Sequence, residues 1–228
     1  MIAIIDYGVG NLFSLRSSLT HLGLEAVVTA DAQTIRKADR LILPGVGAFG
    51  DAMDKLSATG LVPVIREQAA QKPLLGICLG MQIAVIEYAR HAAGITDADS
   101  GEFNELCENK VIDFMPGQSD EIDKGGTLRL GAYPCVIRPG TTMERCYGTS
   151  RISERHRHRY EENNDFREEI VARGLLPVGM SPDGSLVEMV ENPACKWFVA
   201  AQFHPEFKSR PNKPHPLFNG FVKAALER

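Results

Sequence analysis

Apolar positions follow two patterns along residues 1–90: short continuous runs and helical spacing. The runs predict strands over residues 2–6, 26–29, 40–43 and 73–77. Leu12, Leu15, Leu19 and Leu22 recur at helical spacing, and Gly23 ends that helix. Similar spacing predicts helices over residues 51–57, 61–71 and 80–90. Because strands alternate with helices, we expect an α/β fold with a mostly parallel central sheet flanked by helices, whose site lies beyond the carboxyl ends of the strands.

The second half of the chain has a different composition. Residues 94–126 are rich in Asp, Glu, Gly and Asn, and they predict an extended surface region with little regular structure. Beyond it we expect strands over residues 127–130, 133–137, 177–181, 186–191 and 198–202, and helices over residues 165–172 and 216–226. Asp183-Gly184, between two of these strands, is a hairpin-turn signal. No repeat or long linker marks a second domain, so residues 1–228 are expected to form one domain.

The bulk composition is that of an ordinary globular protein, with 44% hydrophobic and 24% charged residues. A net charge of −4 argues against binding nucleic acid through overall charge. No apolar run reaches the roughly 18 residues of a membrane helix, and Met1 leads directly into the first strand, so neither a membrane span nor a secretory signal is expected. The five cysteines are widely spaced and lack a CxxC motif, which argues against a disulfide framework or a zinc site and favours the reducing cytoplasm.

One segment carries a nucleophile signature, Gly76-Ile77-Cys78-Leu79-Gly80, where an apolar strand meets a helical pattern. Flanking glycines permit a sharp strand-to-helix turn, which is the cysteine version of a nucleophile elbow. The following helix dipole favours a negative charge on the sulfur, and the backbone amide of Leu79 points to an oxyanion. The alternative is that Cys78 is a small buried core residue.

A cysteine nucleophile needs a base and a group that orients the base. His204 and Glu206 are two residues apart, Pro205 stiffens the link between them, and the predicted strand over residues 198–202 precedes them. His204 alone would more often be a structural or surface histidine. Together with the elbow, the pair predicts a Cys78–His204–Glu206 triad.

A second oxyanion donor is expected from the glycine-rich end of the third strand. Gly45, Val46 and Gly47 follow Pro44 there, and the alternative is a plain strand-ending turn.

These motifs resemble the class I, triad-type glutamine amidotransferases, and the resemblance covers essentially the whole chain. Residues 1–82 resemble the glutaminase subunit of imidazole glycerol phosphate synthase, through the segments at residues 1–12 and 41–53. Residues 83–228 resemble the glutaminase domain of CTP synthase, through the segments at residues 125–131, 154–161 and 203–211. Two signatures in one chain raise the hypothesis of a recombined or engineered sequence.

The resemblance implies a flavodoxin-like, class I glutamine amidotransferase fold and a role for each matching residue. Cys78, His204 and Glu206 match the triad, and Leu79 matches the oxyanion-hole residue after the nucleophile. The substrate-binding positions that match are Gly45, Gln82, Glu102 and Arg159. Glu102 would bind the ammonium group of glutamine, and Arg159 its carboxylate. No metal or organic cofactor is implied.

Arg159 ends the basic run at residues 155–159, which has an alternative interpretation as an RNA or phosphate patch. Glu154, Glu161 and Glu162 argue against an open basic surface. In a strand, the three arginines of this run would face one way and His156 and His158 the other.

The expected reaction is hydrolysis of L-glutamine to glutamate and ammonia, with the ammonia passed to a synthase on another polypeptide, either a cyclase or an amidoligase. CTP synthases usually have Pro-Gly-Gly where this chain has Pro44-Gly45-Val46. Valine resists positive φ, so we hypothesise that the oxyanion hole is incomplete without a partner. The alternatives are a γ-glutamyl peptide hydrolase on the same fold and a non-catalytic interaction module.

Overall fold

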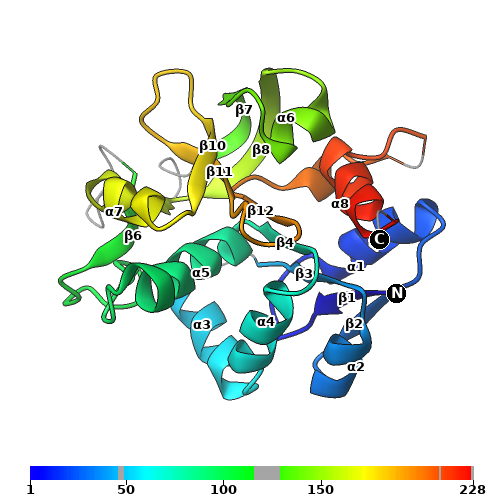
Figure 1. The fold of residues 1–228 in the computed structure, drawn as a ribbon, viewed down its shortest axis with the longest axis horizontal. Coiled ribbons are helices and arrows are strands. Elements are labelled where there is room, and N and C mark those ends of the chain that lie inside the picture. The colour runs from blue at the N-terminus through cyan, green and yellow to red at the C-terminus, as the bar shows by residue number, and fades with distance from the viewer. Residues whose placement is uncertain (46–48, 116–128, 211, 227–228) are drawn as a thin grey trace.

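A nine-stranded mixed sheet forms the centre of the computed structural model, which describes residues 1–45, 49–115, 129–210 and 212–226 (Figure 1). Its strands are β1 (Ile2–Ile5), β2 (Ala26–Thr29), β3 (Arg40–Leu43), β4 (Leu74–Ile77), β7 (Arg129–Ile137), β8 (Arg151–His158), β10 (Leu176–Met180), β11 (Val187–Glu191) and β12 (Phe198–Ala201). They lie in the order β2-β1-β3-β4-β12-β11-β10-β7-β8.

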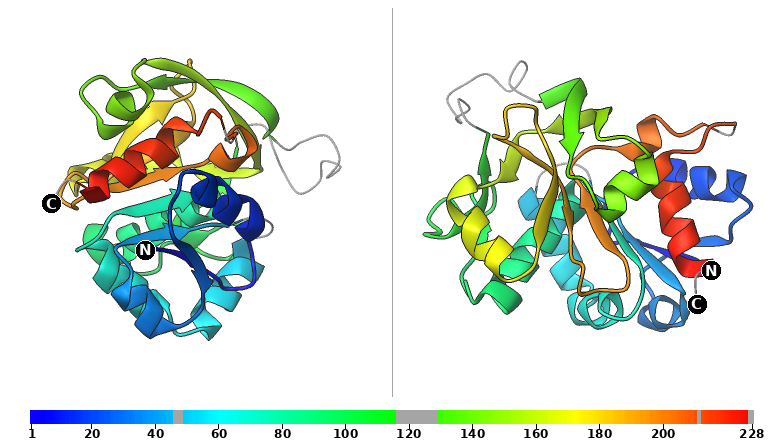
Figure 2. Two further views of the ribbon diagram at one scale, coloured as in Figure 1. Left: turned by 90° about the vertical axis from the view of Figure 1, so that its right-hand side faces the viewer. Right: turned by 45° about the horizontal axis from the view of Figure 1, so that its top comes forward.

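The sheet divides into a parallel and an antiparallel part at β12. The strands from β2 to β12 in this order pair in parallel, and those from β12 to β8 pair antiparallel. The expected α/β fold is therefore confirmed, with an antiparallel C-terminal part. Short hairpin connections such as residues 181–186, which include Asp183-Gly184, join strands of that part, because parallel strands would need long crossover connections. Figure 2 (left) shows the N-terminal elements (blue to cyan) largely on one side of the molecule and the C-terminal ones (yellow to red) on the other.

Helices cover both faces of the parallel part, and further short helices lie beside the antiparallel part. The helices of the described residues are α1 (Leu12–His21), α2 (Ala32–Lys37), α3 (Phe49–Ala58), α4 (Val62–Ala69), α5 (Leu79–Tyr88), η1 (Ala89–Ala93), α6 (Thr142–Tyr147), η2 (Asn164–Phe166), α7 (Arg167–Ala172), η3 (Pro205–Phe207) and α8 (Pro216–Leu226). Ala3 and Ile5 belong to one hydrophobic cluster, whereas Ile2 and Ile4 belong to another. Burial on both faces explains why β1 is a continuous apolar run rather than an alternating one.

A second sheet corrects the expectation of little regular structure over residues 94–126. It has three strands, β5 (Asp99–Ser100), β6 (Lys110–Phe114) and β9 (Tyr160–Glu162), in the order β5-β6-β9. Val111 and Ile112 are fully buried, and these two side chains attach β6 to the core. Residues 116–126 lie outside the described part of the chain.

Two further expectations at the level of elements need correction. The short helices α2 and α6 were not expected, and the side chains of Asp31 and Thr141 cap their N-termini. The strands expected over residues 127–130 and 133–137 are one strand from Arg129 onward, while residues 127 and 128 lie outside the described ranges. Among the described helices, none is both long and apolar enough to cross a membrane.

Candidate active site

Cys78 occupies a strained turn between β4 and α5. Its φ of 53° makes it the one non-glycine residue with positive φ in the described part of the chain. Its backbone N–H donates to the Ala201 carbonyl at 2.7 Å, and the residue is 3% exposed. Non-glycine residues in such conformations concentrate at functional sites, and this one has the form expected of a nucleophile elbow.

The flanking glycines are required by close approach of neighbouring backbone. A Cβ atom on Gly80 would overlap the carbonyl oxygen of Leu43 at the end of β3. A Cβ atom on Gly76 would lie 2.9 Å from the Cβ of Ala200 in β12. The elbow therefore fits between its neighbouring strands only because residues 76 and 80 lack side chains.

Strand pairing brings the expected base next to the nucleophile. Ile77 of β4 pairs with Ala201 of β12 in parallel register, so the chain leaves both strands at the same edge of the sheet. His204 follows two residues after Gln202, and its backbone N–H donates to the Arg155 carbonyl at 2.9 Å. The order of the strands thus places His204 beside the elbow.

His204 and Glu206 form a buried pair. Nδ1 of His204 lies 2.8 Å from Oε1 of Glu206, and the two residues are 1% and 7% exposed. The ring of Phe207 stacks on the imidazole with centroids 4.7 Å apart. Carboxylate and aromatic contacts together fix the ring orientation, as a base that serves a nucleophile requires.

The charge environment of His204 favours its protonated form. Burial lowers the pKa of His204, but the nearby Cys78 sulfur and the Glu206 carboxylate outweigh burial and raise this pKa to about 10. Its Nε2 atom is buried and accepts or donates no well-aligned hydrogen bond among the described residues. A protonated imidazole beside the sulfur can supply a proton to a leaving group.

The sequence did not identify Gln202, although its side chain contacts Cys78. Nε2 of Gln202 lies 3.8 Å from Sγ of Cys78, and its Oε1 accepts from Nε2 of Gln82 at 3.3 Å. Gln82 also donates to the Tyr160 carbonyl at 3.0 Å. The amide group of Gln82 therefore ties α5 to β9. A polar residue at the end of an apolar strand, two positions before His204, was the available signal for Gln202.

The other expected substrate residues lie around the second sheet. Glu102 lies in the turn after β5, and its backbone N–H donates to Oγ of Ser100 at 3.2 Å. Arg159 lies between β8 and β9, with its guanidinium 5.8 Å from the centroid of the Phe114 ring in β6. That ring stacks on Tyr160, whose carbonyl accepts from Gln82. These contacts connect the Arg159 segment to the helix that starts at the nucleophile.

The end of β3 packs directly on the elbow. Gly45 is buried, and a Cβ atom there would overlap the side chain of Leu79. Leu79 is the first residue of α5, where backbone N–H groups lack intrahelical acceptors. Val46 and Gly47, the other expected oxyanion residues, lie outside the described residues.

The alternation predicted for the basic run is confirmed along β8. Arg155 and Arg157 are exposed, whereas His156 and His158 are buried at 1% and 6% exposure. The exposed arginines lie on the side away from the core, and the histidines point into it.

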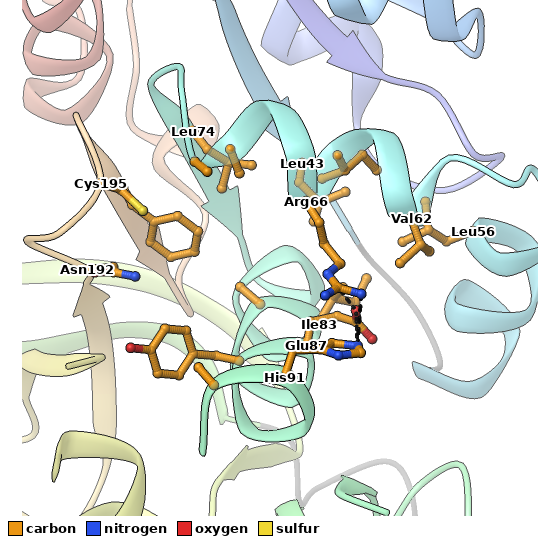
Figure 3. A pocket seen from close by; sticks show the side chains of 17 residues that line it. Leu43, Leu56, Val62, Arg66, Leu74, Ile83, Glu87, His91, Asn192 and Cys195 are labelled. Carbon is orange, nitrogen blue, oxygen red and sulfur yellow. Dashed lines mark hydrogen bonds and ion pairs between the residues drawn. The ribbon is translucent and has the colours of Figure 1, made fainter. Parts of the chain in front are cut away.

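A separate apolar cavity of about 230 Å³ lies between α4 and α5 (Figure 3). Arg66, Glu87 and His91 form a polar group at one side of it, with 3.0 Å between Nη1 of Arg66 and Nε2 of His91. The described residues that line this cavity include no member of the triad, so it is distinct from the site at Cys78.

Comparison with known proteins gives one consistent family. The family model described as glutamine amidotransferase class-I matches residues 3–224. A CTP synthase of Moorella thermoacetica is 47% identical over 94% of this chain, and one of Nitratidesulfovibrio vulgaris is 47% identical over 98% of it. The chain spans 42% of the length of each of these relatives.

The solved structures agree with this family. The glutaminase domain of a Trypanosoma brucei CTP synthase with bound acivicin has a TM-score of 0.84 and 30% identity, covering 100% of this chain and 94% of that chain. A Thermoplasma acidophilum protein described as a GMP synthase subunit shares the fold, with a TM-score of 0.68 and 18% identity, covering 99% of this chain and 93% of that one.

The CTP synthase relatives cover both halves of the chain. They give no support to a link with imidazole glycerol phosphate synthase and histidine biosynthesis, or to a recombined origin. Because the family model spans residues 3–224, the chain belongs to the class-I glutamine amidotransferases, a family of enzymes.

Proposed function

We propose that this chain hydrolyses L-glutamine to glutamate and ammonia, with Cys78 as the nucleophile. The observation that carries the proposal is the strained elbow at Cys78 beside the buried His204–Glu206 pair. Cys78 is the strained residue, and it lies at the same edge of the sheet as His204 and Glu206. A thiol beside an imidazole that a carboxylate orients is suited to acyl transfer.

The first half of the reaction forms a thioester. The Cys78 sulfur attacks the side-chain carbonyl carbon of glutamine, and the carbonyl oxygen becomes an oxyanion. The backbone amide of Leu79 and the loop at residues 45–47 supply its hydrogen bonds. As the tetrahedral intermediate collapses, the C–N bond breaks and His204 gives its proton to the departing ammonia.

The second half releases glutamate. Neutral His204 removes a proton from water, and the resulting hydroxide attacks the thioester carbon. The C–S bond then breaks and the sulfur leaves as the thiolate, which restores the ion pair with protonated His204. Glu206 keeps the imidazole oriented through both halves and does not change its own charge.

Charge complementarity supports free glutamine as the substrate. Its ammonium and carboxylate groups need an anion and a cation, and we assign Glu102 and Arg159 to them. Nε2 of Gln82 donates to Tyr160 and Gln202, so we propose that this side chain forms the floor of the substrate pocket. Its Oε1, which has no hydrogen-bond partner among the described residues, remains as an acceptor.

The ammonia acceptor would be a synthase of the CTP synthase type. The relatives named CTP synthase extend well beyond the length of this chain, which supports an amidoligase domain as the partner. The Val46 hypothesis belongs to this proposal, because an oxyanion loop completed by the partner would couple hydrolysis to the presence of the acceptor.

The test is glutamate release by the parent protein and by Cys78→Ala, with and without an amidoligase domain from a CTP synthase relative. Cys195→Ala is the matched control, because it removes a half-buried cysteine that lines the separate cavity between α4 and α5. We expect release that Cys78→Ala loses and Cys195→Ala keeps. Cysteine-dependent binding of acivicin, which the Trypanosoma brucei domain binds, gives an independent readout.

Each rival function has its own signature in this assay. Cleavage of γ-glutamyl peptides without cleavage of glutamine would favour the peptide hydrolase. No release from either substrate, with or without the amidoligase domain, would refute the catalytic proposal and favour an interaction module.

A further inference from the structure

Three buried side chains lie close together on strands of the antiparallel part. The proposed mechanism uses none of them. His156 and His158 project from β8, and Glu188 projects from β11. Nδ1 of His156 lies 2.9 Å from Nε2 of His158 and 3.4 Å from Oε2 of Glu188. The three donor atoms lie within 4.8 Å of one another, and Glu188 is fully buried.

The backbone contact of His158 orients its ring toward the cluster. Nδ1 of His158 lies 3.2 Å from the Tyr160 carbonyl, which can only accept a hydrogen bond. The proton is therefore on Nδ1, and the lone pair of Nε2 points to the cluster, as in a metal-binding histidine oriented by a carbonyl.

The two carboxylate oxygens of Glu188 have different surroundings. One oxygen of Glu188 accepts a hydrogen bond from Arg129. The other, Oε2, is buried and has no hydrogen-bond partner among the described residues, and it is the oxygen nearer His156. An unpaired buried carboxylate oxygen costs free energy unless a proton or a cation compensates it.

A second buried carboxylate, that of Glu161, contacts the ring of His158. Oε1 of Glu161 lies 3.4 Å from Nδ1 of His158, and both of its oxygens are buried without a hydrogen-bond partner among the described residues. The arrangement of carboxylate, histidine and ligand position is that of the outer shell around many zinc ions.

We propose that Nδ1 of His156, Nε2 of His158 and Oε2 of Glu188 bind a divalent transition-metal ion, with zinc as the best match. Tetrahedral zinc with bonds of about 2.0–2.1 Å has ligand atoms roughly 3.3 Å apart. The two separations of 2.9 and 3.4 Å lie on either side of that value. Two imidazoles and one carboxylate suit zinc, and the cysteine spacing that argued against a zinc site does not bear on these ligands.

A metal-free network is the alternative account of the same cluster. The Nδ1 proton of His156 could be donated to His158, which explains the 2.9 Å separation. That account leaves Oε2 of Glu188 without a hydrogen-bond donor among the described residues. A cation bound to this oxygen would compensate its charge directly.

The ion would act on the fold rather than in the reaction. It would join β8 to β11, two strands that are not neighbours in the sheet. The Arg155 carbonyl of β8 accepts from the backbone of His204, and the Glu188 carbonyl of β11 accepts from that of Gln202. A bridge between these strands would therefore consolidate the backbone that carries the proposed base.

The experiment measures zinc binding to the chelator-treated protein by competition with a chromophoric chelator. We expect one zinc per chain in the parent and in Cys78→Ala, which excludes binding by the triad thiol. Glu188→Gln and His158→Gln should each weaken zinc binding by at least tenfold. His215→Gln is the matched control, because it disrupts another buried pair, with 3.1 Å between His215 and Glu154, and it should keep parent affinity.

A second measurement decides the case if the buried variants do not fold. X-ray absorption at the zinc edge of the loaded parent should give a shell of nitrogen and oxygen ligands without sulfur. A sulfur ligand, equal affinity in folded Glu188→Gln, or no stoichiometric zinc in the parent would each overturn the proposal. These measurements do not test glutamate release, so the zinc proposal and the proposed function can fail independently of each other.

Discussion

Replacement of Glu206 by glutamine tests the assignment of the triad most directly. The change keeps the size of the side chain but removes the charge that faces Nδ1 of His204 at 2.8 Å. Both residues are buried, so solvent screens the pair very little. A hydrogen bond to a charged group is worth about 1.5–3 kcal/mol, which corresponds to a loss of about 10- to 150-fold in kcat/KM.

The same substitution should alter the pH dependence. Without the carboxylate, the pKa of His204 should fall from about 10 toward its ordinary value. Because the folded-state pKa is raised, the stability that the pair contributes is fully present below the ordinary imidazole pKa and is lost as pH rises through about 10. The stability difference between parent and variant should therefore be largest at low pH and shrink as the solution becomes alkaline.

The assay is steady-state glutamate release as a function of pH, with chemical denaturation of the same samples. Glu154→Gln is the matched control, since Glu154 is an equally buried partner of another histidine, His215. The control should lose stability but keep the parent kcat/KM. Parent-like kcat/KM and pH profile in Glu206→Gln, or an equal loss in Glu154→Gln, would refute the orienting role.

Three further substitutions test the surroundings of the site. Gly80→Ala should cost about 1–3 kcal/mol by overpacking and abolish glutamate release, because its Cβ overlaps the Leu43 carbonyl; thermal unfolding and the release assay measure both. Gln202→Leu should destabilise the protein by about 1 kcal/mol in urea, because Gln82 loses an acceptor. Burial, opposed by Arg167, raises the pKa of Glu162 to about 7, so parent stability should fall as pH rises from the ordinary carboxyl pKa through 7; Glu162→Gln should remove that slope in denaturation at several pH values.

The parallel part of the sheet was predictable because both of its faces are buried. The strand at residues 40–43 has the predicted bounds and is buried throughout, as expected of a strand that is covered on both faces. The edge strand at residues 26–29 also has the predicted bounds, although it is only partly buried. The elbow was predictable because its two glycines, Gly76 and Gly80, stand where the backbone leaves no space for a side chain. Helix α2 could not be predicted from the sequence pattern. It has six residues and one buried side chain, Ile35, which is too little to show a helical period.

Residues whose partners lie far along the chain could not be predicted. Gln202 contacts Cys78 and Gln82, which lie far from it in the sequence. Glu188 contacts side chains of β7 and β8 in the same way. Polar composition suggested an exposed region before residue 116, yet β6 is held in the core by pairing with β9. In each case the deciding contact is tertiary, and a pattern along the sequence carries no information on it.

Assembly of the triad depends on the register of one strand pair. His204 and Glu206 are neighbours in the sequence, so their contact is largely local. The contact of the elbow with Gln202, by contrast, joins residues 124 positions apart, and it exists because β4 and β12 pair in parallel with Ile77 opposite Ala201. A slip of one residue would turn every side chain of β12 to the opposite face. The observed register in turn depends on Gly76, because a Cβ atom there would lie 2.9 Å from the Cβ of Ala200. The glycine two residues before Cys78 therefore permits both the sharp turn and the close pairing of the strand that leads to His204.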